Sequence, residues 1–187
     1  MRFGNGYNKR PLAREASHMG RRGAEVNETM TEGRMTGGCL CGSFRFEVTG
    51  PLGDVRLCHC DLCRAASGTA FSANARVPLD RFAVLTGKGT VKEYQSSPGA
   101  WRAFCSSCGS PAYGRTDRDP NHIRIRLGTL PRTAEASITA HVWVGSKAAW
   151  DLIAFDVPKY RKGADEALMA SDDLGPSDLD ALEGFPA

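Results

Sequence analysis

Hydrophobic and polar residues alternate strictly in the first patterned part of the chain. Phe44, Phe46 and Val48 fall on one face of an extended segment, and the residues between them are polar. A period of two residues is typical of a strand with one buried face. The pattern therefore predicts a strand whose phenylalanines face the core.

More short segments have the composition of strands, and turn residues such as Pro78, Gly87, Asn121 and Gly128 separate them. The predicted strands cover residues 70–77, 82–85, 90–95, 101–104, 123–127 and 138–144. Together they predict an all-β fold of short strands.

A single helical segment is predicted near the cysteines, over residues 61–67. Asp61 is placed to cap its start, and Gly68 is placed to end it in a left-handed conformation.

The chain has 187 residues, of which 41% are hydrophobic, enough for one domain with a core. Residues 1–35 lack periodicity and predict a flexible arm, whereas residues 36–160 form the expected domain. Residues 161–187 predict an acidic, disordered tail with a marginal helix at 164–170.

The charge is mild, with 24 basic and 21 acidic residues and a formal net charge of +3. The basic residues do not form a stripe with aromatic residues, so we expect no nucleic-acid partner. No apolar run approaches the roughly 18 residues that cross a bilayer, and the start lacks a signal peptide. We therefore expect a cytoplasmic protein without membrane contact.

The chemistry of the chain is concentrated in its seven cysteines, which lie in tight clusters beside glycine and polar residues. An odd number in a chain without an export signal argues against a disulfide framework and for reduced thiolates. The clusters are Cys39 and Cys41, then Cys58, Cys60 and Cys63, then Cys105 and Cys108. This presentation predicts zinc binding.

The first and last pairs of cysteines each end in Cys-Gly-Ser. A turn that wraps backbone N–H groups around a thiolate needs positive φ just after the ligand, and glycine adopts it freely. We therefore expect Cys39, Cys41, Cys105 and Cys108, here called the outer cluster, to close one tetrahedral, structural zinc site.

The middle cysteines Cys58, Cys60 and Cys63, here called the cysteine trio, have no fourth cysteine left to join them. Three protein ligands and one exchangeable position are typical of a catalytic zinc. Three thiolates leave the site with a charge of −1, which suits it to exchanging another thiolate, so we expect a thiol substrate there.

Two other interpretations of the trio stay open. One of His59, His122 and His141 would complete a purely structural zinc site. Alternatively the three cysteines would perform disulfide chemistry, as Cys-x-x-Cys motifs do.

Three further residues are candidates for supporting roles. If the segment with the first two trio cysteines is extended, His59 points away from the face that they share, which favours support or packing over ligation. Arg64 and Arg102 would offset thiolate charge or bind a carboxylate of the thiol cosubstrate, unless water solvates them.

Several short motifs are distributed along residues 36–160. In chain order they are Gly37-Gly38-Cys39-Leu40-Cys41-Gly42, Cys58-His59-Cys60-Asp61-Leu62-Cys63-Arg64 with Gly68, Phe82, Gly87, Ser96-Ser97-Pro98-Gly99, Arg102-Ala103-Phe104-Cys105-Ser106-Ser107-Cys108-Gly109, Gly128-Thr129-Leu130, His141 and Ser146-Lys147-Ala148-Ala149-Trp150. With these motifs the chain resembles the glutathione-dependent formaldehyde-activating enzyme family, also called the centromere protein V family.

The resemblance implies a β-tent fold with a structural zinc on the outer cluster and a second zinc on the trio. It also implies condensation of glutathione with formaldehyde to S-hydroxymethylglutathione, an activity classed with carbon–sulfur lyases, with the glutathione sulfur on the trio's zinc. Pro131-Arg132 departs from the family pattern, because members commonly carry an acidic residue after Gly-Thr-Leu. Local electrostatics therefore differ at that position.

These observations predict an enzyme with two zinc ions per chain that makes or breaks a carbon–sulfur bond on a small thiol, as a monomer or homodimer. Two alternatives stay open. One is a non-catalytic zinc scaffold for a protein partner, and the other is the same fold acting on a different thiol or electrophile.

Overall fold

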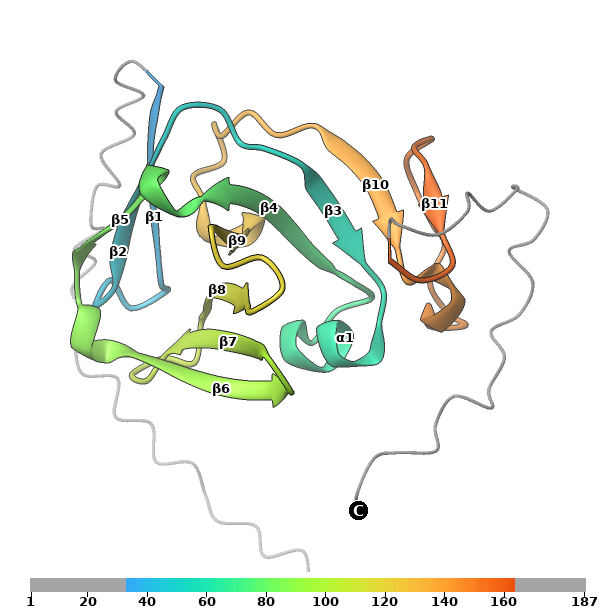
Figure 1. The fold of residues 1–187 in the computed structure, drawn as a ribbon, viewed down its shortest axis with the longest axis horizontal. Coiled ribbons are helices and arrows are strands. Elements are labelled where there is room, and N and C mark those ends of the chain that lie inside the picture. The colour runs from blue at the N-terminus through green and yellow to red at the C-terminus, as the bar shows by residue number, and fades with distance from the viewer. Residues whose placement is uncertain (1–32, 164–187) are drawn as a thin grey trace, which may run out of the picture.

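Strands are the main regular secondary structure of the folded chain. The computed structural model describes residues 33–163 (Figure 1), so the predicted arm before residue 33 and the predicted tail beyond residue 163, with its helix, lie outside the described residues. The described part contains eleven strands, one short α-helix and four 3-10 helices. The predicted all-β class is confirmed.

The strands form two sheets. The smaller is antiparallel, has the order β1-β2-β5, and consists of β1 (Arg34–Gly38), β2 (Arg45–Thr49) and β5 (Phe82–Thr86). The larger has the order β11-β10-β3-β4-β9-β8-β7-β6, with β10 parallel to β3 and β11 and the other pairs antiparallel. Its members are β3 (Val55–Cys58), β4 (Ser72–Pro78), β6 (Val91–Ser97), β7 (Ala100–Cys105), β8 (Pro111–Thr116), β9 (His122–Arg126), β10 (Ile138–Val142) and β11 (Lys159–Tyr160).

The core joins the two sheets through the residues that the alternation identified. Phe44, Phe46 and Val48 are all buried, as predicted. The ring of Phe46 lies 5.3 Å from that of Phe82 in β5, which in turn lies 5.6 Å from Tyr113 in β8 of the larger sheet. Burying such side chains stabilises the fold by about 1.5–3 kcal/mol each, so this aromatic row holds the sheets together.

The folded part is slightly longer than the expected domain of residues 36–160. Strand β1 begins at Arg34, and Met35 is buried in the core. At the other end, the carbonyl oxygen of Lys162 accepts a 2.7 Å hydrogen bond from the N–H of Trp143. Pairing with neighbouring segments orders these residues although their own sequence has little periodicity.

The structure contains strands that alternation did not predict, among them β3 and β8. Strand β3 has only four residues and includes Arg56, whereas β8 begins with Pro111 and has Gly114 inside it. Proline and glycine are depleted in strands. Both strands nevertheless have partners on each side in the larger sheet, so their pairing outweighs their weak local preference.

Helix α1 (Asp61–Ser67) has the predicted bounds. Gly68 ends it in a left-handed conformation, φ 67°, as expected, but Cys60 rather than Asp61 is the N-cap and no side chain caps it. Figure 1 shows α1 inside the bend of the larger sheet, between β4 and β7. The bend thus brings β7 close to the cysteine of this helix.

The four 3-10 helices lie in the connections between strands. They are η1 (Leu79–Arg81), η2 (Lys88–Thr90), η3 (Leu127–Thr129) and η4 (Val144–Ser146). Over residues 33–163, no helix combines the length and the apolar character that crossing a bilayer requires.

Candidate metal centre

The outer cluster assembles from the two predicted pairs. Its four sulfur atoms lie within 4.8 Å of one another. Sγ of Cys41 lies 3.5 Å from that of Cys39 and 3.8 Å from that of Cys105. A tetrahedral zinc with 2.3 Å bonds to sulfur requires sulfur separations of about 3.8 Å, so this donor set fits zinc.

Turns with glycine after the second cysteine shape both halves of the outer cluster. Gly42 and Gly109 have φ of 81° and 73°, as their positions predicted. The N–H of Phe44 donates to Sγ of Cys39 at 3.3 Å, and the N–H of Leu40 reaches Oγ of Ser110 at 3.0 Å. The two turns are therefore tied to each other as well as to the sulfur atoms.

The cysteine trio forms where β3 passes into α1. Cys58 ends β3, Cys60 is the N-cap of α1, and Cys63 lies buried one turn further along. The N–H groups of Cys63 and Arg64 both donate to the carbonyl oxygen of Cys60 at 3.0 Å, so the first helical turn brings these sulfurs together. All three lie within 4.8 Å of one another, and Sγ of Cys58 lies 3.6 Å from that of Cys60.

Within residues 33–163, no fourth histidine, cysteine or carboxylate joins the trio. Nε2 of His59 lies 2.9 Å from Nδ1 of His141, and Nδ1 of His122 lies 2.8 Å from a carboxylate oxygen of Asp119. None of the three candidate histidines therefore completes the site. The trio fits zinc as three donors of an open site.

Electrostatics single out Cys63 within the trio. Hydrogen bonds with Cys58 and Cys60 lower the pKa of Cys63 well below its usual range, and Arg102 lowers it further. The two terminal nitrogens of Arg102 lie 3.8 and 3.7 Å from Sγ of Cys63. Hydrogen bonds with Cys60 and Cys63 raise the pKa of Cys58. The thiol of the trio with the lowered pKa is thus the one beside a guanidinium.

The two predicted arginines have different surroundings. Arg102 reaches the trio from β7, whereas Arg64 forms an ion pair with Asp61 within α1. A guanidinium with a carboxylate partner is less available to a second carboxylate, so Arg102 is the stronger candidate for contact with a substrate.

Arg126 is a further residue of this region that the sequence analysis missed. It donates to Oγ of Ser72 at 2.9 Å and to the side-chain oxygen of Asn74. Ser72 pairs with Cys58 across β3 and β4. Burial lowers the pKa of Arg126, whereas the charges of Cys63 and Cys58 raise it. A second guanidinium therefore adjoins the trio.

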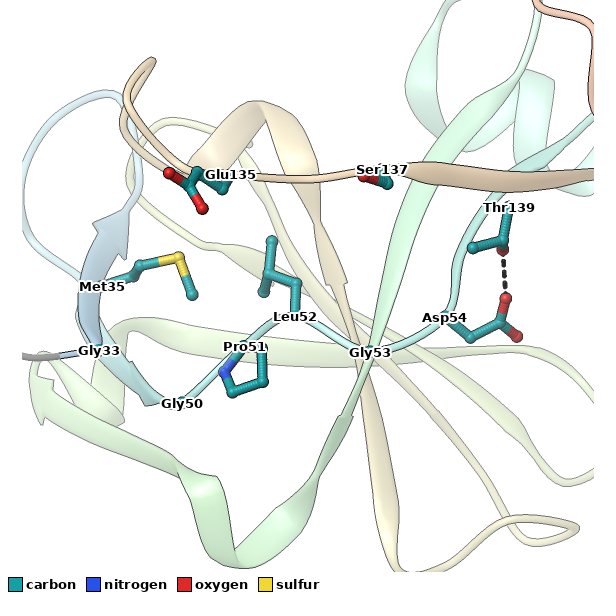
Figure 2. Close-up of a pocket in the computed structure, with 10 residues that line it drawn as sticks. All are labelled: Gly33, Met35, Gly50, Pro51, Leu52, Gly53, Asp54, Glu135, Ser137 and Thr139. Atoms are coloured by element: carbon teal, nitrogen blue, oxygen red, sulfur yellow. Dashed lines mark hydrogen bonds between the residues drawn. The ribbon is translucent and has the colours of Figure 1, made fainter.

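A cavity of about 640 Å³ lies elsewhere, where β1 begins and the chain approaches β3. Figure 2 shows Met35, Leu52 and Glu135 around it, with the side chains of Asp54 and Thr139 hydrogen bonded at one end. None of the cysteines lines this cavity, so it is separate from both clusters.

The chain is similar to known proteins. The model of a family described as glutathione-dependent formaldehyde-activating enzyme matches residues 34–146, which include both cysteine clusters. A protein from Fusarium vanettenii, named provisionally as such an enzyme, is 29% identical over 101 residues, 50% of this chain and 54% of that protein. The chain thus spans about half the length of this curated relative.

A solved structure was also found. The crystal structure of a Rhodobacter sphaeroides protein aligns with a TM-score of 0.47 and 24% identity, over 56% of this chain and 97% of that one.

Proposed function

Because this chain belongs to the glutathione-dependent formaldehyde-activating enzyme family, we propose that it forms or cleaves a carbon–sulfur bond on a glutathione-type thiol at the cysteine trio. One observation carries the proposal. Three sulfur atoms converge within 4.8 Å, and the described residues supply no fourth ligand. Such an open position is what a site needs to accept a substrate.

Cys58, Cys60 and Cys63 would hold one zinc ion, and the four cysteines of the outer cluster would hold a second, structural one. A zinc ion in the open site supplies Lewis acidity that lowers the pKa of a thiol brought to it. The protein's own contribution is to bring three sulfurs together and to place cationic side chains beside them.

The reaction proposed is the addition of the thiol to formaldehyde. An electron pair on the thiol sulfur forms the new bond to the carbonyl carbon, and the carbon–oxygen π pair moves to the oxygen. That oxygen takes up the proton which the thiol loses. The product is an S-hydroxymethyl thiol, and the reverse reaction is the carbon–sulfur lyase step.

Arg102 and Arg126 would recognise the carboxylate groups of the thiol substrate. Glutathione carries two carboxylates, and arginine binds a carboxylate through paired N–H groups. Arg102 lies against Cys63, and Arg126 is held by Ser72 and Asn74. A carboxylate bound at either guanidinium would bring the substrate close to the trio.

We predict that Arg102→Gln raises the KM for glutathione by about 10- to 100-fold, because a hydrogen bond between charged groups contributes about 1.5–3 kcal/mol. The KM for 2-mercaptoethanol, which has no carboxylate, is expected to change much less. Steady-state kinetics with both thiols measure the difference.

Arg115→Gln is the matched control for this variant. Arg115 lies on the neighbouring strand β8 and pairs with Glu93 at 2.7 Å rather than with a cysteine. An equal loss for the two thiols in Arg102→Gln would contradict carboxylate recognition and favour an effect of Arg102 on Cys63 alone.

The proposed function is tested by metal content and by cobalt spectra. Elemental analysis of the purified protein is expected to find two zinc ions per chain. After replacement by Co²⁺, glutathione is expected to change the absorption spectrum, because the open site gains a thiolate ligand. The control is the Cys60→Ala protein, in which the outer cluster alone remains and glutathione should have no effect.

Two results would contradict the proposal. A single metal per chain would mean that the trio does not form a metal site. That result would favour the interpretation in which the three cysteines perform disulfide chemistry. Two metals without a response to glutathione would instead favour a zinc scaffold that binds a protein partner.

A further inference from the structure

A buried cluster of titratable side chains adjoins the trio through His59, the residue between Cys58 and Cys60. It consists of His59, His141 and Asp151, whose exposed fractions are 0%, 1% and 8%. His59 follows β3, His141 lies in β10, and Asp151 lies in a turn after η4. Burying polar groups is costly unless they are paired, so the contacts within this histidine–aspartate cluster have to be accounted for atom by atom.

The contacts run in a line from Asp151 to the carbonyl of Ala154. Oδ2 of Asp151 lies 3.2 Å from Nδ1 of His59, and neither atom has another polar partner within residues 33–163. Nε2 of His59 lies 2.9 Å from Nδ1 of His141, whose Nε2 lies 2.7 Å from the carbonyl oxygen of Ala154. Each ring nitrogen therefore faces one defined atom.

The carbonyl end of this line determines the direction of its hydrogen bonds. The oxygen of Ala154 can only accept, so Nε2 of His141 carries hydrogen, and Nδ1 of a neutral His141 accepts from Nε2–H of His59. Nδ1 of a neutral His59 is then an acceptor as well, and it faces the carboxyl of Asp151. One proton between these two atoms joins them, and the whole line is then satisfied.

The turn that carries Asp151 is itself anchored. The backbone N–H of Asp151 donates to the carbonyl oxygen of Ala148 at 3.0 Å, and Nζ of Lys147 donates to the carbonyl oxygen of Asp151 at 3.2 Å. Lys147 and Ala148 belong to the Ser146–Trp150 segment that the sequence analysis singled out without assigning it a role. The segment thus presents the carboxyl of Asp151 to His59.

His59 connects this support to the metal ligands. It stands between Cys58 and Cys60, and its own N–H donates to the carbonyl oxygen of Val142 in β10 at 3.0 Å. In an extended segment, neighbouring side chains point to opposite faces. Holding the ring of His59 inward therefore turns the sulfurs of Cys58 and Cys60 outward, where they lie 3.6 Å apart.

We infer that Asp151 is a positioning residue for the trio: together with His141 it fixes the ring of His59, and so holds Cys58 and Cys60 at the spacing that a metal requires. The inference rests on the proposed function only in taking the trio as the metal site. It assigns a role to three residues that neither bind the metal nor touch the thiol. Groups that support ligands in this way typically change metal affinity by 10- to 100-fold.

The test compares Asp151→Asn with Asp151→Leu, two side chains of similar size. The asparagine amide donates to Nδ1 of His59 without an added proton, whereas leucine leaves this buried nitrogen unpaired. We expect the Leu variant to lose about 10- to 100-fold in Co²⁺ affinity at the trio and to have an altered trio spectrum. The Asn variant should retain the wild-type Co²⁺ affinity and spectrum of the trio. The Co²⁺ affinity of the outer cluster should be unchanged in both variants.

Titration of each full-length protein with Co²⁺ against a chelator, monitored by absorption, measures the two sites separately. Wild-type affinity at the trio in the Leu variant would overturn the inference, and so would an equal loss at both clusters, which indicates general destabilisation. Failure of glutathione to change the wild-type spectrum would contradict the proposed function while leaving this comparison intact.

A second readout needs no variant. Side-chain ¹⁵N NMR of the wild-type protein is expected to show hydrogen on Nε2 of both His59 and His141 and none on Nδ1 of His141. The opposite tautomer of His141 would break the line to Asp151 and overturn the inference, even if the Leu variant failed to fold.

Discussion

Replacing Cys60 by alanine is expected to abolish thiol turnover while the fold survives. Cys60 contributes one of three sulfurs to the open site, and two sulfurs hold a metal ion poorly. A metal ion in an active site contributes several kcal/mol to catalysis, so the rate should fall by at least roughly 100-fold. The measurement is the formation of S-hydroxymethylglutathione from glutathione and formaldehyde, corrected for the uncatalysed reaction.

The fold should survive because neither the outer cluster nor the aromatic core includes Cys60 or a neighbouring residue in the sequence. The Tm of Cys60→Ala is expected to stay close to that of the wild type. Leu62→Ala is a suitable control, since Leu62 is exposed in the same helix, between two trio cysteines, and binds no metal. Full activity in Cys60→Ala would contradict the open-site mechanism.

Replacing Cys105 by serine is expected, in contrast to Cys60→Ala, to cause a large loss of stability. Cys105 is fully buried at the end of β7 and belongs to the outer cluster, whose other half, Cys39 and Cys41, follows β1. A structural zinc site contributes folding free energy directly, and its ligands connect segments that are far apart in the chain. We expect a loss of roughly 3–5 kcal/mol and a decrease in Tm of at least about 10 °C.

Thermal denaturation followed by circular dichroism, with zinc analysis of the same samples, measures this effect. Ser107→Ala is the control, because Ser107 is exposed in the same turn and is not a cysteine ligand. Unchanged Tm in Cys105→Ser would show that the outer cluster does not stabilise the fold. A chelator that removes both metals should reproduce the loss of stability in the wild type.

Local sequence predicted the elements whose residues follow a strict period. The alternation at Phe44, Phe46 and Val48 placed one buried strand, and helix α1 has the predicted bounds. Both predictions were correct because they depend on residues close together in the chain. The strand follows from alternation that buries one face, and the helix from a helical run that Gly68 ends. Strands β3 and β8 were missed because pairing, rather than composition, makes them strands.

The division of the cysteines was also predictable, for a chemical reason. The Cys-Gly-Ser sequence that ends each outer pair requires the same turn, so Cys41 and Cys108 were recognised as partners across the chain, and the structure joins their pairs. The remaining three cysteines then formed the second cluster by elimination. Candidate metal ligands are recognised by residue type and short spacing, and both are visible in the sequence.

The surroundings of the trio were decided only by the tertiary structure. Arg126 looks like one more polar residue of a half-buried strand until the pairing of β9 with β4 places it beside Asn74, next to Ser72 and the trio. Asp151 and His59 are far apart in the sequence and meet because β10 lies parallel to β3. The sequence by itself thus determined the strand with strict alternation, the helix and the two groups of cysteines, because each depends on local pattern. Which charged groups face those ligands depends on strand pairing between distant segments, and that pairing exists only in the folded molecule.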